Sequence, residues 1–323
     1  MREICDGLRF PEGPIAMPDG SVLLVEIARG TLTRVTPDGR VEVVAETGGG
    51  PNGAALGPDD TVYICNNGGF SWREASLGPG PDGSPQPLLL PVHQAEDYTG
   101  GSIQTVRVRD GAAVGPVATL YAHCGDRPLR GPNDLVFDRH GGFYFTDLGK
   151  GRVDDMDRGA LYYGLADGSG VREVAYPLLT PNGVGLSPAG DRVYWAETAT
   201  GRVWFLDLEG PGVPRSTGPQ ISSTSAAATM LANVGGAARL DSLAVDSEGN
   251  VCVATLMVGA ITAIAPDGGI RAIVPVPGGD PMITNVCFGG PDLSTAYITA
   301  SGTGRLLAHE WHCPGLPLEH LNR

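Results

Sequence analysis

The sequence lacks any long apolar run. Its first residues, MREICDGLRF, contain no stretch of the kind found in secretory signals, and no segment approaches the length of a transmembrane helix. The six cysteines include no CxxC pair, and Cys65, Cys252 and Cys287 lie inside strand patterns, where they are expected to be small buried side chains. These absences predict a reduced, cytoplasmic protein that does not bind membranes.

Positive charge is also scarce. The chain has 22 Lys and Arg against 36 Asp and Glu, which gives a formal net charge of −14. An acidic surface repels the phosphates of nucleic acids and anionic lipids, so both are excluded as expected partners. The charge mildly favours cations, although solubility alone would also account for it.

Two common kinds of catalytic site are missing or poorly supported. The chain has no G-x-S-x-G nucleophile elbow. Its histidines form only one close pair, His309 and His312. On a strand that spacing places the two rings on opposite faces, so a zinc site built from histidines is not favoured.

What the chain has in abundance is a repeated motif, punctuated by 49 glycines and 27 prolines. Each copy opens with a polar or acidic residue and runs through an apolar strand, a Pro/Asp/Gly turn and a second apolar strand. The opening residues are Glu12, Asn52, Asn133, Asn182, Asp241 and Asn285, here called the opener ring. A strand-rich repeat of roughly 40–50 residues is typical of a propeller blade.

The repeats predict an all-β fold in one domain over residues 1–323, a six-bladed β-propeller of four-stranded antiparallel blades. In the first repeat the strands are expected at 14–17, 21–27, 31–36 and 41–45. The sixth repeat is one strand short, and REICDG precedes the first. An N-terminal strand that completes the sixth blade would close the ring and remove an exposed edge.

Two insertions interrupt the repeats. Residues 69–101 fall between the second and third strands of the second repeat, and residues 209–238 precede Asp241. Both are expected to rise over the opener ring, and the first to act as a lid that binds substrate. Its aromatic and polar residues Trp72, His93 and Tyr98 favour a lid over a solvated loop.

The opener ring is the strongest functional signal. Carboxylate and amide oxygens suit hard divalent cations such as calcium, magnesium or manganese. The alternative is that these residues only shape the turn into each strand, which is the interpretation adopted for Asn52 and Asn285. Glu12 fits that alternative poorly, because glutamate is not a favoured turn residue.

Two arginines lie on loops of the third repeat near the ring. Arg130 precedes GPND, and Arg152 follows FTDLGKG. Each either binds a substrate oxygen or forms a surface ion pair, and the sequence leaves both interpretations open.

Five motifs together resemble the SMP-30/gluconolactonase/LRE family of metal-dependent lactonases. They are PEGP around Glu12, GPNDLVFD with FTD around Asn133, PNGVGLSP around Asn182, DSLAVDSEGNVCVA around Asp241, and CFGG at 287–290. They occur in the family's order and span most of the chain.

The resemblance implies a six-bladed propeller with one divalent metal ion, whether calcium, zinc, magnesium or manganese. It implies that Glu12, Asn182 and Asp241 hold the ion, and that Asn133 lies beside it. The implied substrates are sugar lactones. The apolar residues of the 69–101 insertion, such as Trp72 and Leu88–Leu90, would instead suit a less polar lactone.

We therefore predict a hydrolase that opens a small-molecule lactone by metal-activated attack of water. Asp241 is expected to assist proton removal, and Asn133 and Arg130 to orient the substrate, with Trp72, His93, Tyr98 and Arg152 as further candidates for substrate binding. Two alternatives stay open: a metal-dependent lyase, isomerase or non-lactone esterase on the same scaffold, and a propeller that binds metal without catalysis.

Overall fold

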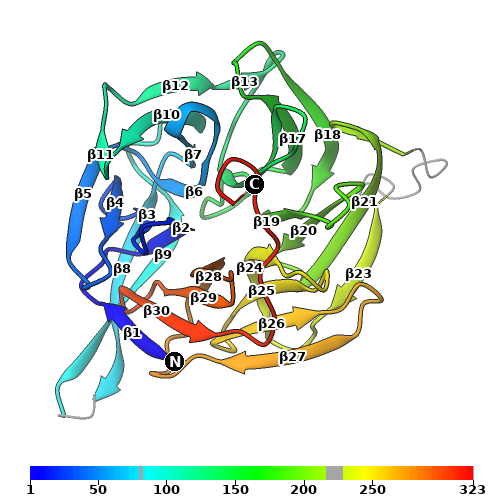
Figure 1. The fold of residues 1–323 in the computed structure, drawn as a ribbon. Coiled ribbons are helices and arrows are strands. Elements are labelled where there is room, and N and C mark those ends of the chain that lie inside the picture. Colours follow the sequence, from blue (N-terminus) through cyan, green and yellow to red (C-terminus); the bar gives the residue numbers. More distant parts are fainter. Residues whose placement is uncertain (80–82, 216–227, 323) are drawn as a thin grey trace.

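The computed structural model describes residues 1–79, 83–215 and 228–322, and its strands form six antiparallel sheets arranged as the blades of a propeller (Figure 1). In these ranges the only helix is a short 3-10 turn, η1 (Pro58–Asp60), and no helix is long and apolar enough to cross a membrane. The predicted six-bladed, all-β fold is confirmed.

The first three blades follow the chain from the inner strand outward. Blade 1 holds β2 (Pro11–Ala16), β3 (Val22–Glu26), β4 (Thr31–Val35) and β5 (Val41–Glu46). Blade 2 holds β6 (Pro51–Leu56), β7 (Thr61–Asn66) and β10 (Ser102–Arg109), which pairs with β11 (Ala112–Ala113) and β12 (Ala118–Tyr121). Blade 3 holds β15 (Pro132–Phe137), β16 (Gly142–Asp147), β17 (Gly159–Leu165) and β18 (Val171–Leu178).

The remaining blades repeat this order. Blade 4 holds β19 (Pro181–Leu186), β20 (Arg192–Glu197) and β21 (Arg202–Gly210), which pairs with β22 (Val213–Pro214) and β23 (Thr229–Asn233). Blade 5 holds β24 (Arg239–Val245), β25 (Val251–Leu256), β26 (Ala260–Ile264) and β27 (Ile270–Pro275). Blade 6 holds β28 (Ile283–Gly289), β29 (Thr295–Ala300), β30 (Arg305–Glu310) and β1 (Arg2–Cys5). Two small hairpins, β8 (Phe70–Pro79) with β9 (Pro85–Gln94) and β13 (His123–Cys124) with β14 (Arg127–Pro128), lie outside the blades.

The sequence patterns explain why each blade has inner and outer strands. The inner strands β2 and β3 are buried along their whole length, whereas the outermost strand β5 alternates between exposed and half-buried residues. Adjacent blades pack through clusters of aromatic and aliphatic side chains, as where Tyr63 of blade 2 meets Phe137 and Phe143 of blade 3 with ring centroids 5.0 and 5.5 Å away. Burial of these faces holds neighbouring blades together.

The ring closes between the two ends of the chain. β1 pairs antiparallel with β30, and Arg2 lies opposite Ala308. The N-terminal strand therefore supplies the outer strand of blade 6, as predicted, and the open edge of β30 is covered.

Every inner strand begins at the same face of the propeller, here called the upper face, and the opposite one is the lower face. The insertion after β7 forms the β8–β9 hairpin, here called the insertion hairpin, on the upper face, because β7 ends and β10 begins there. It docks on loops of two other blades, since Leu89 N donates to Gly302 O of blade 6 at 2.8 Å and Gln94 N donates to Gly151 O of blade 3 at 2.8 Å.

The described part of the second insertion that directly follows β21 does not lie over the opener ring, which corrects the prediction for that part. It connects β21 to β23, and in a four-stranded blade the connection between the third and fourth strands lies at the lower face. The end of β21 contacts a lower turn there, with Leu208 N donating to Asp191 O at 2.8 Å. Residues 216–227 of this insertion lie outside the described residues.

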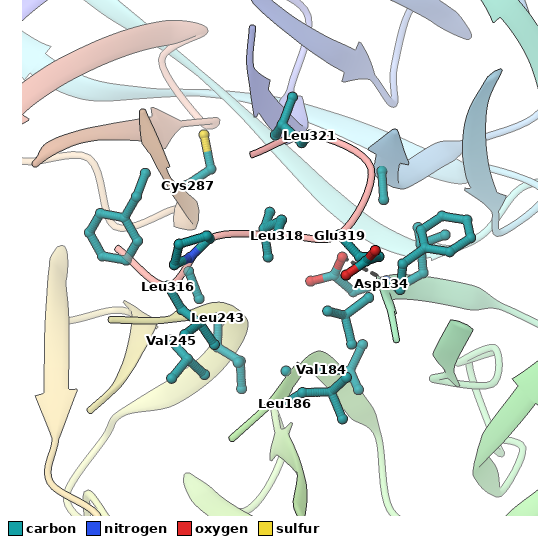
Figure 2. A pocket seen from close by; sticks show the side chains of 18 of the residues that line it. Asp134, Val184, Leu186, Leu243, Val245, Cys287, Leu316, Leu318, Glu319 and Leu321 are labelled. Carbon is teal, nitrogen blue, oxygen red and sulfur yellow. Dashed lines mark hydrogen bonds between the residues drawn. The ribbon is translucent and has the colours of Figure 1, made fainter. Parts of the chain in front are cut away.

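The C-terminal segment 311–322, here called the tail, runs across the lower face near the propeller axis (Figure 1). Between the tail and the inner strands lies a cavity of about 130 Å³. Figure 2 shows Leu316, Leu318 and Leu321 of the tail facing Val184 and Leu243 of the inner strands across it. The lower end of the axis is therefore covered, and its mostly aliphatic lining also includes Asp134 and Glu319.

Candidate metal and substrate site

A β-bulge near the start of each inner strand helps to place the opener ring. In all six blades the pairing between the first and second strands shifts register there, as between Glu12 and Ile15, Pro132 and Leu135, and Leu240 and Leu243. A bulge inserts an unpaired residue and re-aims the neighbouring side chains. The regular repeat thus yields six polar side chains at one level, all of them buried.

Glu12 is held in place by its neighbours in blades 1 and 6. Its side chain is only 2% exposed, and its Oε2 accepts hydrogen bonds from Asn285 Nδ2 at 2.8 Å and Gly13 N at 3.0 Å. Burial raises the pKa of Glu12 to about 7, against the lowering effect of these hydrogen bonds. Asn285 therefore orients a ring member and does more than shape its own turn.

Asp241 and Asn182 lie side by side in blades 5 and 4. Burial raises the pKa of Asp241 well above its ordinary value, and the charges of Glu12 and Asp134 raise it further, while a hydrogen bond with Asn182 lowers it. Asn182 is fixed by Thr198 Oγ1, to which its Nδ2 donates at 3.1 Å. The three residues predicted to hold a metal thus belong to one buried electrostatic group.

Asp134 is a member of this group that the sequence argument missed. It is buried, and burial followed by the charge of Glu12 raises its pKa to about 7. The sequence feature that could have identified Asp134 is its position directly after Asn133. In the structure both residues lie within the bulge of β15, where two successive side chains remain near the axis. Three acidic side chains, Glu12, Asp134 and Asp241, therefore interact inside the protein.

Among the residues that the structure describes, no basic side chain balances these carboxyls. The causes that shift their pKa values are burial, one another, and hydrogen bonds from amide, hydroxyl and backbone groups, with no lysine or arginine among them. Buried carboxylates without a counter-charge must either hold protons or bind a cation. The donor set of carboxylate and amide oxygens therefore fits a divalent ion of the hard type.

Asn133 contributes an unused acceptor to the same region. Its side chain is 4% exposed, and its Oδ1 has no hydrogen-bond partner within the described ranges. Its backbone oxygen accepts a hydrogen bond from Asn52 Nδ2 at 3.2 Å, and Asn67 Nδ2 donates to Asn52 Oδ1 at 3.0 Å. A buried oxygen without a partner is costly, which favours a ligand or water at this point.

The two arginines differ in their surroundings. Arg152 is exposed and forms ion pairs with Asp155 and Asp157, with its Nη2 3.0 Å from Asp157 Oδ1. This matches the surface-pair interpretation. Arg130 has an exposed side chain beside the upper mouth, and its backbone oxygen accepts a hydrogen bond from the Tyr98 hydroxyl at 2.6 Å.

The insertion hairpin forms an apolar wall on the upper face. Trp72 packs against Phe10, the residue two positions before Glu12, with ring centroids 5.1 Å apart. Leu89 is buried in a cluster that joins Phe10 of blade 1 with Leu256 and Met282 at the upper ends of blades 5 and 6. The hairpin is therefore packed over the approach to Glu12.

The other two candidates in the insertion lie near its base. Tyr98 is bonded to the loop of Arg130, and His93 Nδ1 lies 3.0 Å from Gln94 O. Gly68 and Gly69 at the start of the hairpin have φ values of 78° and 92°, a backbone conformation that glycine adopts without strain. The glycine pair thus permits the turn by which the chain leaves blade 2.

Lys150, also missed by the sequence argument, anchors this base. It is 2% exposed, and its Nζ donates to Gly69 O at 2.6 Å and to Asn67 Oδ1 at 3.3 Å, beneath the ring of Phe70 at 4.1 Å from the centroid. Burial lowers the pKa of its amine to about 7, opposed by Asp147 and Asp157. Through Asn67 and Asn52, the lysine links the hairpin to the loop of Asn133.

Comparisons with known proteins match this architecture. Residues 10–302 match the sequence profile of the SMP-30/Gluconolactonase/LRE-like region. A gluconolactonase of Zymomonas mobilis is 24% identical over 92% of this chain and 78% of its own length. A lactonase drp35 of Staphylococcus saprophyticus is 29% identical over 60% of this chain and 50% of its own length.

Solved structures share the fold at lower identity. The calcium-binding protein regucalcin from Agrobacterium tumefaciens has a TM-score of 0.69 at 19% identity, covering 100% of this chain and 97% of that one. A gluconolactonase from Xanthomonas campestris has a TM-score of 0.68 at 18% identity, covering 95% and 88%. These likenesses confirm the propeller.

Proposed function

We propose that this protein, which belongs to the SMP-30/gluconolactonase/LRE-like family, is a divalent-metal-dependent hydrolase that opens the ring of a lactone. The observation that carries the proposal is the buried group of Glu12, Asp134 and Asp241, together with the nearby Asn133 oxygen. Within the described part of the chain this group has no basic partner and that oxygen has no hydrogen-bond partner. Relatives named gluconolactonase and lactonase support the substrate class.

Glu12, Asn182 and Asp241 would hold the ion. When bound, a divalent cation polarises an acyl carbonyl and lowers the pKa of a nearby water. Asn285 and Thr198 keep the side chains of Glu12 and Asn182 in place through the hydrogen bonds described above. Asp134 adds negative charge next to this set, which strengthens the preference for a cation.

Asp241 is the residue to which we assign proton removal. The charges of Glu12 and Asp134 and its own burial raise the pKa of its carboxyl, which makes its carboxylate a stronger base than an ordinary aspartate. The water oxygen bonds to the acyl carbon, the ring acyl–oxygen bond breaks, and the departing ring oxygen takes up a proton. The product is the open-chain hydroxy acid.

Asn133 and Arg130 are the proposed orienting groups. The amide of Asn133 lies among the ring residues and offers an acceptor that no described residue uses. The exposed guanidinium of Arg130 stands at the mouth and would attract a polar substituent or the carboxylate of the product.

The insertion hairpin indicates which lactones fit. Trp72 and Leu90, which are half-buried, present an apolar surface beside the buried Leu89, whereas His93 and Tyr98 supply polar groups nearer its base. A wall of this composition favours a lactone with an apolar substituent over a fully hydroxylated sugar lactone. Substrate choice would then depend on the hairpin and chemistry on the opener ring.

Two lactones of contrasting polarity, gluconolactone and an alkyl-substituted δ-lactone, test the proposal. Acid release at constant pH, followed by mass analysis, should show products heavier by one water, with higher kcat/KM for the alkyl-substituted ring. Asn133→Ala should reduce the rate for both substrates, and Arg139→Ala, a surface change at the lower face, should not. A product of unchanged mass would favour the isomerase alternative, and no turnover of either ring would contradict the proposal.

A further inference from the structure

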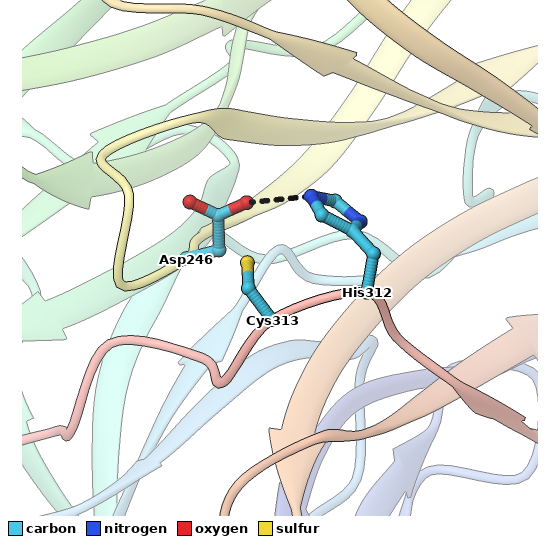
Figure 3. A group of neighbouring side chains, drawn as sticks. All are labelled: Asp246, His312 and Cys313. Carbon is cyan, nitrogen blue, oxygen red and sulfur yellow. Dashed lines mark ion pairs between the residues drawn. The ribbon is translucent and has the colours of Figure 1, made fainter.

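A second cluster of metal-binding groups lies at the lower face, away from the opener ring. Asp246 follows β24, and His312 and Cys313 lie at the start of the tail (Figure 3). One carboxylate oxygen, the His312 ring nitrogen and the Cys313 sulfur all lie within 4.8 Å of one another. Asp246 Oδ2 is 3.9 Å from His312 Nε2.

The equivalent turn in blade 3 shows which part of this cluster the fold requires. There Asp138 Oδ1 accepts backbone hydrogen bonds from His140 and Gly142, and Oδ2 accepts one from the Tyr163 hydroxyl at 2.9 Å. In blade 3 a single carboxylate oxygen is thus enough to shape the turn.

In blade 5 the second oxygen has different neighbours. Asp246 Oδ1 accepts from the backbone of Glu248 and Asn250 at 3.0 and 2.9 Å, as in blade 3. Its Oδ2 accepts from Asn250 Nδ2 at 2.8 Å and faces an imidazole and two thiols, one of them Cys252 Sγ at 3.8 Å. The extra groups go beyond what the turn needs.

The backbone already holds these groups together. Ser247 N donates to Pro314 O at 2.8 Å, and Leu316 N donates to Val245 O at 2.9 Å, so the tail pairs with the end of β24 on both sides of Asp246. Asp246 itself is fully buried, whereas the His312 side chain is 42% exposed. The cluster therefore has a rigid buried base and one ligand at the surface through which an ion can enter.

We propose that Asp246, His312 and Cys313 bind a borderline divalent metal such as Zn²⁺, and that this ion fastens the tail to blade 5. Thiolate, imidazole and carboxylate are the ligands that zinc prefers, and calcium and magnesium are disfavoured by sulfur. Around a tetrahedral zinc, nitrogen and oxygen ligands lie about 3.3 Å apart, so the measured pair would close by roughly 0.6 Å. Water or Cys252 completes the coordination.

The proposed ion has a structural consequence. The tail covers the lower end of the cavity with Leu316, Leu318 and Leu321, and it joins blade 5 beside the cluster. A metal that binds only the folded protein stabilises it by mass action, by about 2.7 kcal/mol at a free concentration one hundred times Kd. Zinc would therefore stabilise the closed lower face and leave the opener ring unchanged.

Cobalt(II) titration of the chelator-treated full-length protein tests the site directly, because a cobalt–thiolate bond gives an ultraviolet charge-transfer band that oxygen ligands do not. The wild type should develop this band, which should saturate by about two equivalents because the opener ring binds cobalt as well, and Zn²⁺ should displace it. His312→Ala should weaken cobalt binding at least tenfold, and Cys313→Ser should abolish the band. Asp241→Ala, which alters only the upper face, should retain it.

His309→Ala is the matched control, since His309 lies three residues earlier on β30 and outside the cluster. It should titrate as the wild type does. The proposal is overturned if no charge-transfer band forms even with cobalt in excess of both sites, or if the band is equally strong in the His312 and Cys313 variants. If Cys313→Ser fails to fold, the pair His312→Ala and His309→Ala decides the question alone.

Discussion

Strand β24 places a buried aspartate near each end of blade 5, and the two differ in their neighbours. Asp241, at the upper face, interacts with Glu12, Asp134 and Asn182. Asp246, at the lower face, completes its turn with one oxygen and directs the other toward nitrogen and sulfur groups. The same residue type, once within β24 and once directly after it, is thus assigned two metal preferences and two roles, because the surrounding donors differ.

Removing the upper aspartate should produce the largest effect. Asp241→Ala should lower kcat/KM for lactone opening at least 10³-fold, because it loses a proposed metal ligand and the proposed base together. Circular dichroism should stay unchanged. His312→Ala at the lower end should keep kcat/KM within about twofold, and a comparable loss in both variants would remove the distinction between the two ends.

Replacing the insertion hairpin should have the next largest effect. With residues 70–99 exchanged for a short Gly/Ser turn, KM for an alkyl-substituted lactone should rise more than tenfold, because the wall of Trp72 and Leu89 is gone. Small lactones should stay within about tenfold in kcat/KM, which is roughly 1.4 kcal/mol. Loss of metal affinity measured by calorimetry would show that the hairpin supplies a ligand, with His93 the first residue to test.

The stability of the metal-free protein should depend on pH through the upper carboxyls. In the folded protein the pKa of Glu12 is raised from 4.5 to about 7, and that of Asp134 from 3.8 to about 7. At pH values between the ordinary and the raised pKa, the folded state therefore holds more protons than the unfolded state. The free energy of unfolding should therefore fall as pH rises from about 4 to 7, by an amount on the order of 3 kcal/mol for each of the two groups.

Urea denaturation of chelator-treated protein at several pH values measures this slope. Glu12→Gln should flatten it, and calcium or manganese should stabilise the protein more at pH 8 than at pH 5, because the cation binds the deprotonated carboxylates. A stability that rises with pH over this window in the metal-free protein would contradict the assignment.

The smallest effect is expected at the base of the hairpin. Lys150→Met leaves Gly69 O and Asn67 Oδ1 without their donor, which should cost about 1–3 kcal/mol and make the hairpin more sensitive to limited proteolysis. KM should change only a few-fold. Arg152→Met, two residues along in exposed ion pairs, is the control and should behave as the wild type.

The sequence was sufficient for the fold because strand repeats and turns are local signals. The copies beginning at Glu12 and Asp241 carry strand and turn patterns within about twenty residues, and the missing strand of blade 6 pointed to β1. The expected position of the second insertion was wrong for its described part because the face of the propeller depends on which strands of blade 4 the insertion joins, and the repeat pattern does not show that.

The contacts around the site were harder to predict because they join distant positions. Lys150 reaches Asn67 and Gly69 from another blade, 83 and 81 residues away, and Asn285 reaches Glu12 across 273 residues. Asp134 became relevant only through a bulge, which a regular strand pattern does not reveal. Residue types at the opener positions indicated the chemistry, but only the folded ring indicates which side chains support them.

The central claim is that lactone opening at the opener ring requires a divalent cation, and one measurement addresses it most directly. Wild-type protein is stripped with a chelator, its metal content is verified by mass spectrometry, and acid release from a lactone is followed before and after one ion at a time is restored. We predict that the rate falls to the uncatalysed level and returns with calcium, magnesium, manganese or zinc, but not in Asp241→Ala. An unchanged rate in verified metal-free protein would contradict the account.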